Sequence, residues 1–289
     1  MVETPLPAEW ITRLLHRPEA SHKGDFGRAL LIGGSRGMSG AIALAGMAAL
    51  RGGAGLVKLA VPDACLDTVA AIEPSYITVP LACDKQGRIA LAAQGKIEEL
   101  ASDATCVACG PGLGRSDELD QLVASLYRSL SNPMVVDADG LNALATRTEQ
   151  LGEHAGPRII TPHPGEFRRL SAVSDVSPEE MVPLAAELAA MHDLVVVLKG
   201  HRTLIADPTR QARNPTGNPG MATGGTGDVL TGLLVALVCQ NVPPFEAAQL
   251  AVYLHGLAGD LAAIELGQPS LIASDLVDFL PCAFLEAAD

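Results

Sequence analysis

The chain has 289 residues, a length that fits one large α/β domain or two small ones. Its hydrophobic fraction of 48% can form a sizeable core, and its net charge of −13 repels nucleic-acid backbones, so we expect no nucleic-acid partner. The longest apolar run found, residues 41–50, is about half of a membrane span, and the N-terminus resembles no signal peptide, so we expect a cytoplasmic protein without a membrane partner.

Short apolar strands alternate with helical stretches along the chain. In chain order, strands are predicted over residues 28–32, 56–61, 105–108, 133–136, 158–161 and 193–198. A helix is predicted over residues 41–51, and residues 203–206 are predicted to form a hairpin with the sixth strand. The alternation predicts an α/β fold, a doubly wound, mostly parallel sheet with helices on both faces, and we expect residues 1–289 to form one domain.

Glycines and polar side chains gather directly after these strands, at the edge where open α/β sheets bind ligands. The segments concerned are GGSRG, GPGLG, DADGLN, PHPGE and KGHRT. We expect them to line one cleft together with the glycine-rich segment 214–232, NPTGNPGMATGGTGDVLTG.

The glycine-rich segment places GGTGD before an apolar helix that is predicted over residues 229–239. Gly224, Gly225 and Gly227 leave backbone N–H groups free to converge on an anion, and the helix dipole adds positive charge. Asp228 adds one carboxylate beside this anion hole. The pattern predicts a phosphoryl-transfer site in which Asp228 takes the proton of a hydroxyl group. The alternative is that Asp228 is an ordinary helix N-cap.

Further candidate groups stand at the ends of other strands. Asp137 and Asp139 either hold Mg²⁺ through waters or, for Asp139, cap a helix that starts near residue 141. Glu166 follows the Pro-His-Pro-Gly turn, where a capping role is less obvious, and is another candidate for the metal.

Two histidines and a lysine are also candidates. His163 stands between two prolines, which favours a ligand contact over a core position. His255 lies within a helical stretch and is expected to be structural. Lys199, one of five lysines, ends an apolar strand and either neutralises phosphate or is a surface residue.

Three partial motifs point to other kinds of site. GGSRGMSGA could be a dehydrogenase dinucleotide turn, but the chain lacks the Tyr-x-x-x-Lys pair that short-chain dehydrogenases use. The same stretch matches G-x-S-x-G around Ser35, yet a nucleophile elbow normally comes later in its sheet. Cys106 and Cys109 form a C-x-x-C inside an apolar strand, where residues three apart face opposite sides, so we interpret them as buried core thiols.

Taken together, these motifs closely resemble the ADP-dependent NAD(P)H-hydrate dehydratases, a family of the ribokinase-like superfamily. The matching segments follow one another over residues from about 23 to 260: KGDFGRALLIGGSRGMSGA, GPGLGR, VVDADGLNAL, ITPHPGEF, LKGHRT and GNPGMATGGTGDVLTG. Many members carry an additional N-terminal epimerase domain. Because about 22 residues precede the match, we expect the epimerase activity to be absent here.

The resemblance implies a ribokinase-like fold and a carbon–oxygen lyase that repairs NADH or NADPH damaged by addition of water to the nicotinamide ring. A nucleotide phosphorylates the added hydroxyl, which then leaves as phosphate, so that ADP yields AMP, phosphate and NAD(P)H. The resemblance also implies Mg²⁺, ADP rather than ATP as co-substrate, and a homo-oligomer such as a tetramer.

The resemblance also assigns residues to roles. Asp228 would activate the hydroxyl, and the amides of Gly225, Thr226 and Gly227 would stabilise the transferring phosphoryl group. The hydrated dinucleotide (NADHX or NADPHX) would contact Ala41, Gly114, His163 and Asp228. The adenine nucleotide would contact Lys199, Gly200, His201, Arg202, Thr203, Asn218, Gly224, Gly225, Thr226 and Gly227, and Glu166 would hold Mg²⁺ through water.

Two other functions use the same phosphoryl-transfer residues. One is a kinase of this superfamily that phosphorylates a vitamin-like alcohol and releases the ester. The other is an adenine-nucleotide sensor without catalysis, although a sensor has no use for a base directed at the anion hole.

Overall fold

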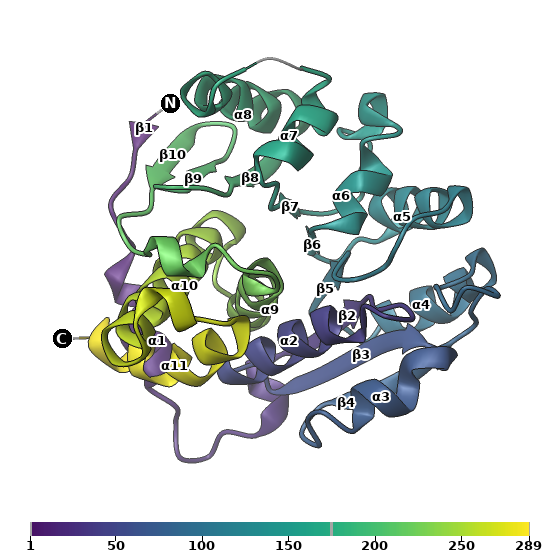
Figure 1. Ribbon diagram of the computed structural model, residues 1–289, viewed down its shortest axis with the longest axis horizontal. Coiled ribbons are helices and arrows are strands. Elements are labelled where there is room, and N and C mark those ends of the chain that lie inside the picture. The colour runs from purple at the N-terminus through teal and green to yellow at the C-terminus, as the bar shows by residue number, and fades with distance from the viewer. Residues whose placement is uncertain (1, 174–175, 289) are drawn as a thin grey trace.

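A computed structural model describes residues 2–173 and 176–288 (Figure 1). The strands within these ranges join into one ten-stranded sheet in the order β1-β10-β9-β8-β7-β6-β5-β2-β3-β4. Neighbouring strands are parallel except at β8–β9 and β9–β10. The strands are Val2–Glu3 (β1), Arg28–Ile32 (β2), Leu56–Pro62 (β3), Ile77–Leu81 (β4), Cys106–Cys109 (β5), Met134–Val136 (β6), Arg158–Ile160 (β7), Leu194–Leu198 (β8), Leu204–Ala206 (β9) and Arg210–Arg213 (β10).

Helices cover both faces of this sheet, so the predicted doubly wound architecture is confirmed (Figure 1). Helices α2, α9, α10 and α11 pack on one face, and α4 to α8 pack on the other. The helices are Ala8–Leu15 (α1), Ser39–Arg51 (α2), Leu66–Ala70 (α3), Gln94–Ala101 (α4), Asp117–Ser129 (α5), Asp139–Leu144 (α6), Pro164–Ser171 (α7), Pro178–His192 (α8), Thr226–Cys239 (α9), Pro244–Leu266 (α10) and Ala273–Glu286 (α11).

Strand residues alternate between the two hydrophobic cores that these layers create. Val195 and Val197 of β8 face the α9–α10 side, whereas Val196 faces the other side. Cys106 and Cys109 of β5 likewise lie in opposite cores, both as free buried thiols, which confirms their interpretation as core residues. Because both faces are covered, the strands can be apolar at nearly every position.

Each end of a predicted strand lies within one residue of the observed end, and the β8–β9 hairpin is confirmed. The strands β1, β4 and β10 were not predicted. β4 contains Pro80 and lies at the edge of the sheet, where a missing N–H is tolerated, and β10 has the polar sequence RQAR. A search for buried apolar strands cannot detect segments of this kind.

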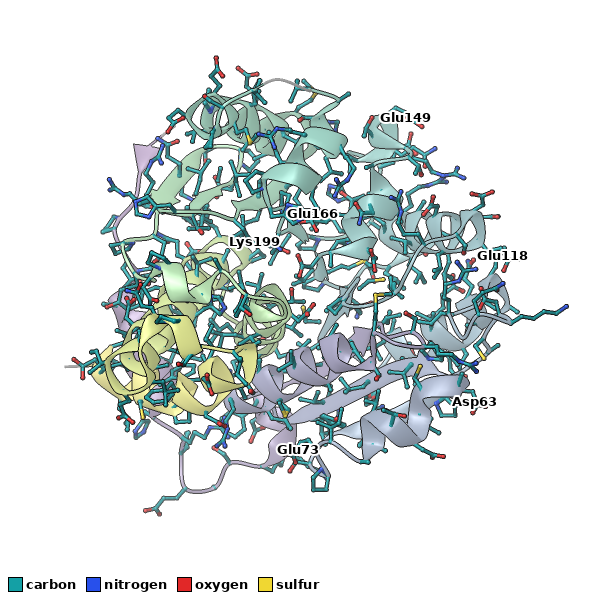
Figure 2. The ribbon with its side chains drawn as sticks, viewed as in Figure 1. Asp63, Glu73, Glu118, Glu149, Glu166 and Lys199 are labelled. Atoms are coloured by element: carbon teal, nitrogen blue, oxygen red, sulfur yellow. The ribbon has the colours of Figure 1, made fainter. Side chains whose placement is uncertain are left out.

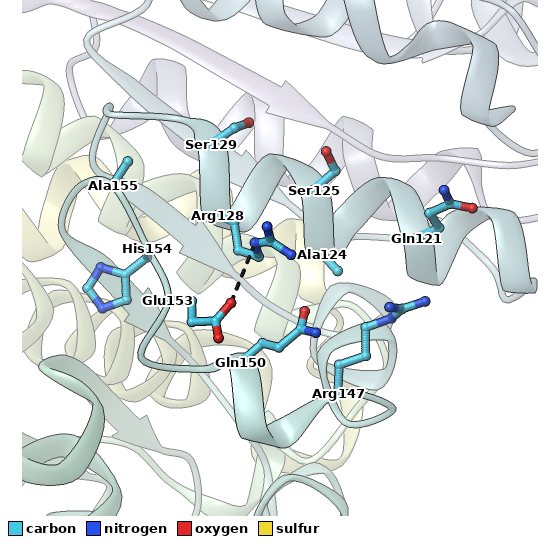
Figure 3. Close-up of a pocket in the computed structure, with 10 residues that line it drawn as sticks. All are labelled: Gln121, Ala124, Ser125, Arg128, Ser129, Arg147, Gln150, Glu153, His154 and Ala155. Carbon is cyan, nitrogen blue, oxygen red and sulfur yellow. Dashed lines mark ion pairs between the residues drawn. The ribbon is translucent and has the colours of Figure 1, made fainter.

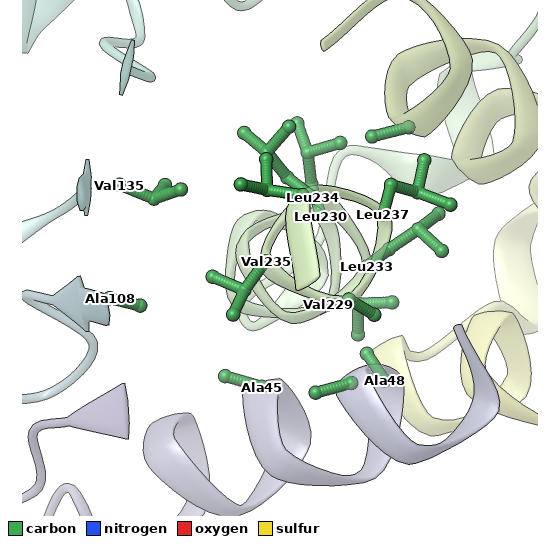
Figure 4. Close-up of a cluster of buried hydrophobic side chains, with 14 of the residues drawn as sticks. Ala45, Ala48, Ala108, Val135, Val229, Leu230, Leu233, Leu234, Val235 and Leu237 are labelled. Carbon is green, nitrogen blue, oxygen red and sulfur yellow. The ribbon is translucent and has the colours of Figure 1, made fainter. Parts of the chain in front are cut away.

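Helix α9 packs unusually close to α2. A methyl group built on Gly232 would overlap the backbone carbonyl oxygen of Ala45 and crowd Ala48. Figure 4 shows Ala45 and Ala48 of α2 beside Val229 of α9. Since all of α9 from Val229 to its end is buried, the helix that carries Asp228 is held firmly in the core.

Helix α10 is long and apolar enough to cross a membrane by length and composition. Polar residues interrupt its sequence, so the helix contains no long uninterrupted apolar run. Within the protein, 67% of its most apolar 18-residue window is buried, as in the core helix of a folded domain. It packs against α9 and α11 and brings His255 to the site described next.

Candidate active site

A cavity of about 800 Å³ lies where the carboxyl ends of β6, β7 and β8 meet the N-terminus of α9. Figure 2 shows two of its residues, Glu166 and Lys199, near one another at the centre of the molecule. The predicted site residues that line it are His163, Glu166, Lys199, Gly200, His201, Arg202, Thr203, Asn218, Gly225, Thr226, Gly227 and Asp228. The segments DADGLN, PHPGE and KGHRT therefore share a cavity with the glycine-rich segment as expected, whereas GGSRG and GPGLG do not line it.

The ammonium group of Lys199 lies between two carboxylates. Its Nζ atom is 2.6 Å from Oδ1 of Asp137 and 3.8 Å from Oε2 of Glu166. The side chain is 18% exposed, so the alternative that Lys199 is a surface residue is wrong. Burial alone would lower the pKa of Lys199, but the charges of Asp137 and Glu166 outweigh burial and raise it, so the amine stays protonated.

The first turn of α9 lies at the cavity, where the glycines predict an anion hole. Gly225 is the N-cap, with a left-handed φ of 94° that favours glycine. The N–H groups that follow belong to the first helical turn and point out of the helix end into the cavity. A Cβ atom on Gly227 would lie 3.3 Å from Nζ of Lys199, so the ammonium group and the turn adjoin one another.

Asp228 occupies the third position of α9 rather than the N-cap, so the capping alternative is wrong. Burial is the main cause that raises the pKa of Asp228 to about 7, and the negative charges of Asp137, Asp139 and Glu166 add to it against the opposing charge of Lys199. A carboxylate with a pKa near neutrality is well suited to accept a proton during catalysis.

His163 and Glu166 form a capping box at the start of α7. Nδ1 of His163 accepts a hydrogen bond of 2.9 Å from the N–H of Gly165, and the N–H of His163 donates to Oε2 of Glu166 at 2.8 Å. Nε2 of His163 is 3.2 Å from Oε1 of Glu166. Burial raises the pKa of Glu166 to about 7, and burial followed by the charge of Lys199 lowers the pKa of His163.

His255 was expected to be structural, and it also borders the cavity. Its Nε2 atom is 2.9 Å from the carbonyl oxygen of Thr226, and burial lowers the pKa of His255 to about 4. The ring is therefore neutral and donates from Nε2 to that carbonyl. This hydrogen bond fixes the first residue of α9. The sequence alone could not have shown this role of His255.

Sequence comparison identifies the family of this chain. A family model described as NAD(P)H-hydrate dehydratase matches residues 29–281. The chain belongs to this family.

Several relatives from this family are closely similar. The bifunctional NAD(P)H-hydrate repair enzyme Nnr of Moorella thermoacetica is 46% identical over 279 residues, which cover 96% of this chain and 53% of that protein. The chain thus spans about half the length of the bifunctional relatives that it matches. The ADP-dependent (S)-NAD(P)H-hydrate dehydratase of Bacillus subtilis is 37% identical over 93% of this chain and 92% of its own length.

Solved structures share the fold. A crystal structure of ADP/ATP-dependent NAD(P)H-hydrate dehydratase from Bacillus subtilis, co-crystallized with ATP/Mg²⁺, has a TM-score of 0.81 and 34% identity, covering 99% of this chain and 100% of that one. A ribokinase-like superfamily protein from Enterococcus faecalis has a TM-score of 0.82 and 27% identity, covering 98% and 95%. The predicted ribokinase-like fold is therefore confirmed.

The remaining residues predicted for this dehydratase family lie beside the cavity rather than in its lining. Oδ2 of Asp139 accepts a hydrogen bond of 2.9 Å from the N–H of Gly114, and a Cβ atom on the nearby Gly112 would lie 3.1 Å from Cβ of Ala41. Ala41, in the first turn of α2, thus lies close to Gly112, and Gly114 lies next to Asp139. Around Gly224, the space next to Cα is open. The ligand contacts predicted for Ala41, Gly114 and Gly224 stay predictions.

The structure decides whether Asp139 caps a helix. Ala138, not Asp139, is the N-cap of α6, so the capping alternative for Asp139 is wrong. The carboxylate of Asp139 instead accepts from the N–H of Gly114 and from Nδ2 of Asn142. Asp137 is 1% exposed and its oxygens accept hydrogen bonds from other side chains.

A second cavity, of about 710 Å³, lies between α5 and the segment 147–155 (Figure 3). Most of its side chains are polar, and Arg128 pairs with Glu153 across it at 3.7 Å. The cluster of carboxylates around Lys199 lies in the other cavity, of about 800 Å³.

Ser35 is the residue that the G-x-S-x-G match would make a nucleophile. It is buried, and its hydroxyl donates a 2.8 Å hydrogen bond to the carbonyl oxygen of Gly112, which links two glycine loops. We expect Ser35→Ala to lower stability by about 1 kcal/mol and Tm by about 2–4 °C, with enzyme turnover within about threefold of wild type. Calorimetric melting and a turnover assay would check this. A hundredfold loss of turnover with an unchanged Tm would contradict it and favour the nucleophile.

Proposed function

We propose that this chain catalyses the nucleotide-dependent dehydration of hydrated NADH or NADPH. With ADP as the donor, the products are NAD(P)H, AMP and phosphate. The observation that carries the proposal is the placement of Asp228, poised near neutral pKa, beside the first turn of α9 and the ammonium group of Lys199. The names of the closely similar relatives support the same substrate.

In the first step, the hydroxyl oxygen of the hydrated ring attacks the terminal phosphorus of the nucleotide while Asp228 takes the hydroxyl proton. Negative charge develops on the phosphoryl oxygens. The backbone amides of Thr226 and Gly227 and the ammonium group of Lys199 stabilise that charge. The bond from phosphorus to the leaving nucleotide breaks and AMP departs.

In the second step, the C–O bond of the phosphorylated ring breaks and phosphate leaves with the bonding electrons. The adjacent ring carbon loses a proton to a base or to the departing phosphate, and the C=C double bond of the nicotinamide ring returns. Phosphate is a much better leaving group than hydroxide, which explains why a nucleotide is consumed in what is formally a loss of water.

A magnesium ion would enter this site bound to the phosphates of the nucleotide. Among the residues that the structure describes, no cluster of three or more His, Cys, Asp or Glu side chains is placed to hold a metal. Mg²⁺ commonly binds through phosphates, waters and one or two carboxylates, and it would neutralise phosphate charge here. Glu166, whose carboxylate lies at the cavity beside Lys199, would reach the ion through a water molecule.

We propose further that residues 1–289 form one ribokinase-like domain, that this domain assembles into a homo-oligomer, and that it acts in the cytoplasm. Exposed apolar side chains near the ends of α10 and α11, Ile264, Ile272 and Leu285, are consistent with an interface between copies. Light scattering of the purified protein would test the assembly, and a monomer at micromolar concentration would contradict it.

The test of the function is a direct assay. Purified protein is mixed with hydrated NADH, Mg²⁺ and either ADP or ATP, and the return of NADH absorbance and the release of phosphate are followed. Recovery of NADH with equal release of phosphate supports the dehydratase, and the nucleotide that works gives the preference. A stable phosphorylated product would favour the kinase, and nucleotide binding without turnover would favour the sensor.

Lys199→Ala tests the contribution of the ammonium group to nucleotide binding. We expect the Kd for ADP to rise about 10- to 100-fold, because a charge-assisted contact to phosphate is lost, while turnover at saturating ADP falls less. Calorimetric titration and steady-state kinetics would check the two parts. An unchanged ADP affinity would mean that Lys199 does not contact the phosphates.

A further inference from the structure

Asp137 is a buried carboxylate that the proposed mechanism does not use. It follows β6 directly, and three hydrogen-bond donors from three different elements converge on it. Oδ1 accepts from Nζ of Lys199 at 2.6 Å and from the hydroxyl of Thr161 at 2.7 Å. Oδ2 accepts from the hydroxyl of Thr231 at 2.8 Å. The carboxylate thus joins the ends of β7 and β8 to helix α9.

We propose that Asp137 is a positioning residue, which holds the ammonium group of Lys199 against Gly227 at the point where the phosphoryl group is transferred. This inference rests on the proposed function and deepens it. A lysine side chain is a flexible four-carbon stem and needs a partner to fix its charge in one place. Asp137 is that partner, because its 2.6 Å contact is much shorter than the 3.8 Å contact with Glu166.

Other roles for Asp137 are less compatible with its surroundings. Its side chain is 1% exposed, and three donors already engage its two oxygens. These hydrogen bonds, one of them from an ammonium group, stabilise the charged form of Asp137 and weaken it as a general base or as a metal ligand. Since Thr231 belongs to α9, the same carboxylate also fixes the distance between Lys199 and the helix that carries Asp228.

The charge of Asp137 acts on four titratable groups around the cavity, namely His163 and Glu166 around α7, Lys199 after β8 and Asp228 on α9. His201 and Arg202 after β8 and His255 on α10 also border the cavity. Removal of a negative charge lowers the pKa of its neighbours, acids and bases alike. Neutralising Asp137 should therefore lower the pKa of Asp228 and move its titration toward lower pH.

The variant that tests the proposal is Asp137→Asn, which keeps the size and one oxygen acceptor but removes the charge. We expect the Kd for ADP to rise about 3- to 30-fold, less than in Lys199→Ala, because the ammonium group is no longer held in place, while kcat at saturating ADP falls less. The acidic limb of the pH–rate profile should move down by about one pH unit.

Asp207→Asn is the matched control. Asp207 is also a buried carboxylate paired with a cation, Arg210 at 2.7 Å, and it lies after β9 outside the cavity. This variant should lower Tm without moving the acidic limb or the Kd for ADP. Asp137→Glu restores the charge with one more methylene group, so the acidic limb should return toward wild type while ADP binding stays weaker.

The outcomes distinguish a failure of the proposed function from a failure of the inference about Asp137. If wild type restores no NADH, the proposed function fails, and the ADP affinity of Asp137→Asn still tests the link between Asp137 and Lys199. If wild type is active and Asp137→Asn behaves like Asp207→Asn, with a lower Tm and with the acidic limb and the Kd for ADP unchanged, then Asp137 is merely structural and the inference is overturned. A shift of the acidic limb together with weaker ADP binding supports it.

Discussion

Asp228→Asn is expected to lower kcat for dehydration of hydrated NADH by about 10²- to 10⁴-fold, the usual contribution of a general base. The amide has nearly the same shape as the carboxylate but cannot accept the hydroxyl proton. ADP affinity should stay close to that of wild type, since the first turn of α9 and Lys199 remain in place. Stopped-flow absorbance for turnover and calorimetry for ADP would measure the two quantities.

The wild-type pH profile provides an independent check on the same residue. Because the pKa of Asp228 is about 7, its carboxyl is protonated below that value and cannot take a proton, so the rate should fall as the pH drops through about 7. In Asp228→Asn this acidic limb should disappear from the residual activity. Near-normal turnover in the variant would remove Asp228 from the role of base.

Gly232→Ala is expected to lower the stability of the protein strongly. The new methyl group would meet the carbonyl oxygen of Ala45 on α2, a backbone atom that cannot rotate away. We expect a loss of about 3 kcal/mol or more from overpacking. In a chain of this size the loss corresponds to a fall in Tm of roughly 5–10 °C, which calorimetry would measure.

Gly40→Ala is the control for this pair of helices. Gly40 also belongs to α2, but the space around its Cα is open and its backbone is not left-handed. Alanine there should leave Tm unchanged or raise it slightly, because alanine favours helix more than glycine does. Equal losses of Tm in both variants would mean that contact between α2 and α9 is not the cause.

The sequence was most informative where local chemistry is distinctive. Apolar runs located most of the strands, and the glycines before Asp228 indicated the helix start that borders the cavity, since each of these patterns is contained in a few neighbouring residues. The prediction began α9 at residue 229, whereas it begins at Thr226. The apolar pattern does not extend into the first turn, where Gly227 and Asp228 serve the site rather than the core.

The role of Asp137 could not be predicted in the same way. Its three donors stand 24, 62 and 94 residues further along the chain, so only the folded sheet brings them together. For the same reason the burial of Lys199 could not be decided from its place at the end of a strand. Residues that meet through the tertiary fold leave no spacing pattern in the sequence.

The two carboxyl groups near Lys199 titrate close to neutrality, with pKa values of about 7 for both Glu166 and Asp228. A polyphosphate that enters the cavity brings more negative charge and stabilises their protonated forms. Nucleotide binding is therefore thermodynamically linked to proton uptake from the solvent, and the more highly charged nucleotide takes up more protons. In the proposed mechanism the same protons suppress Asp228 as the base, so the conditions that favour tight binding and those that favour rapid repair diverge as the medium becomes acidic.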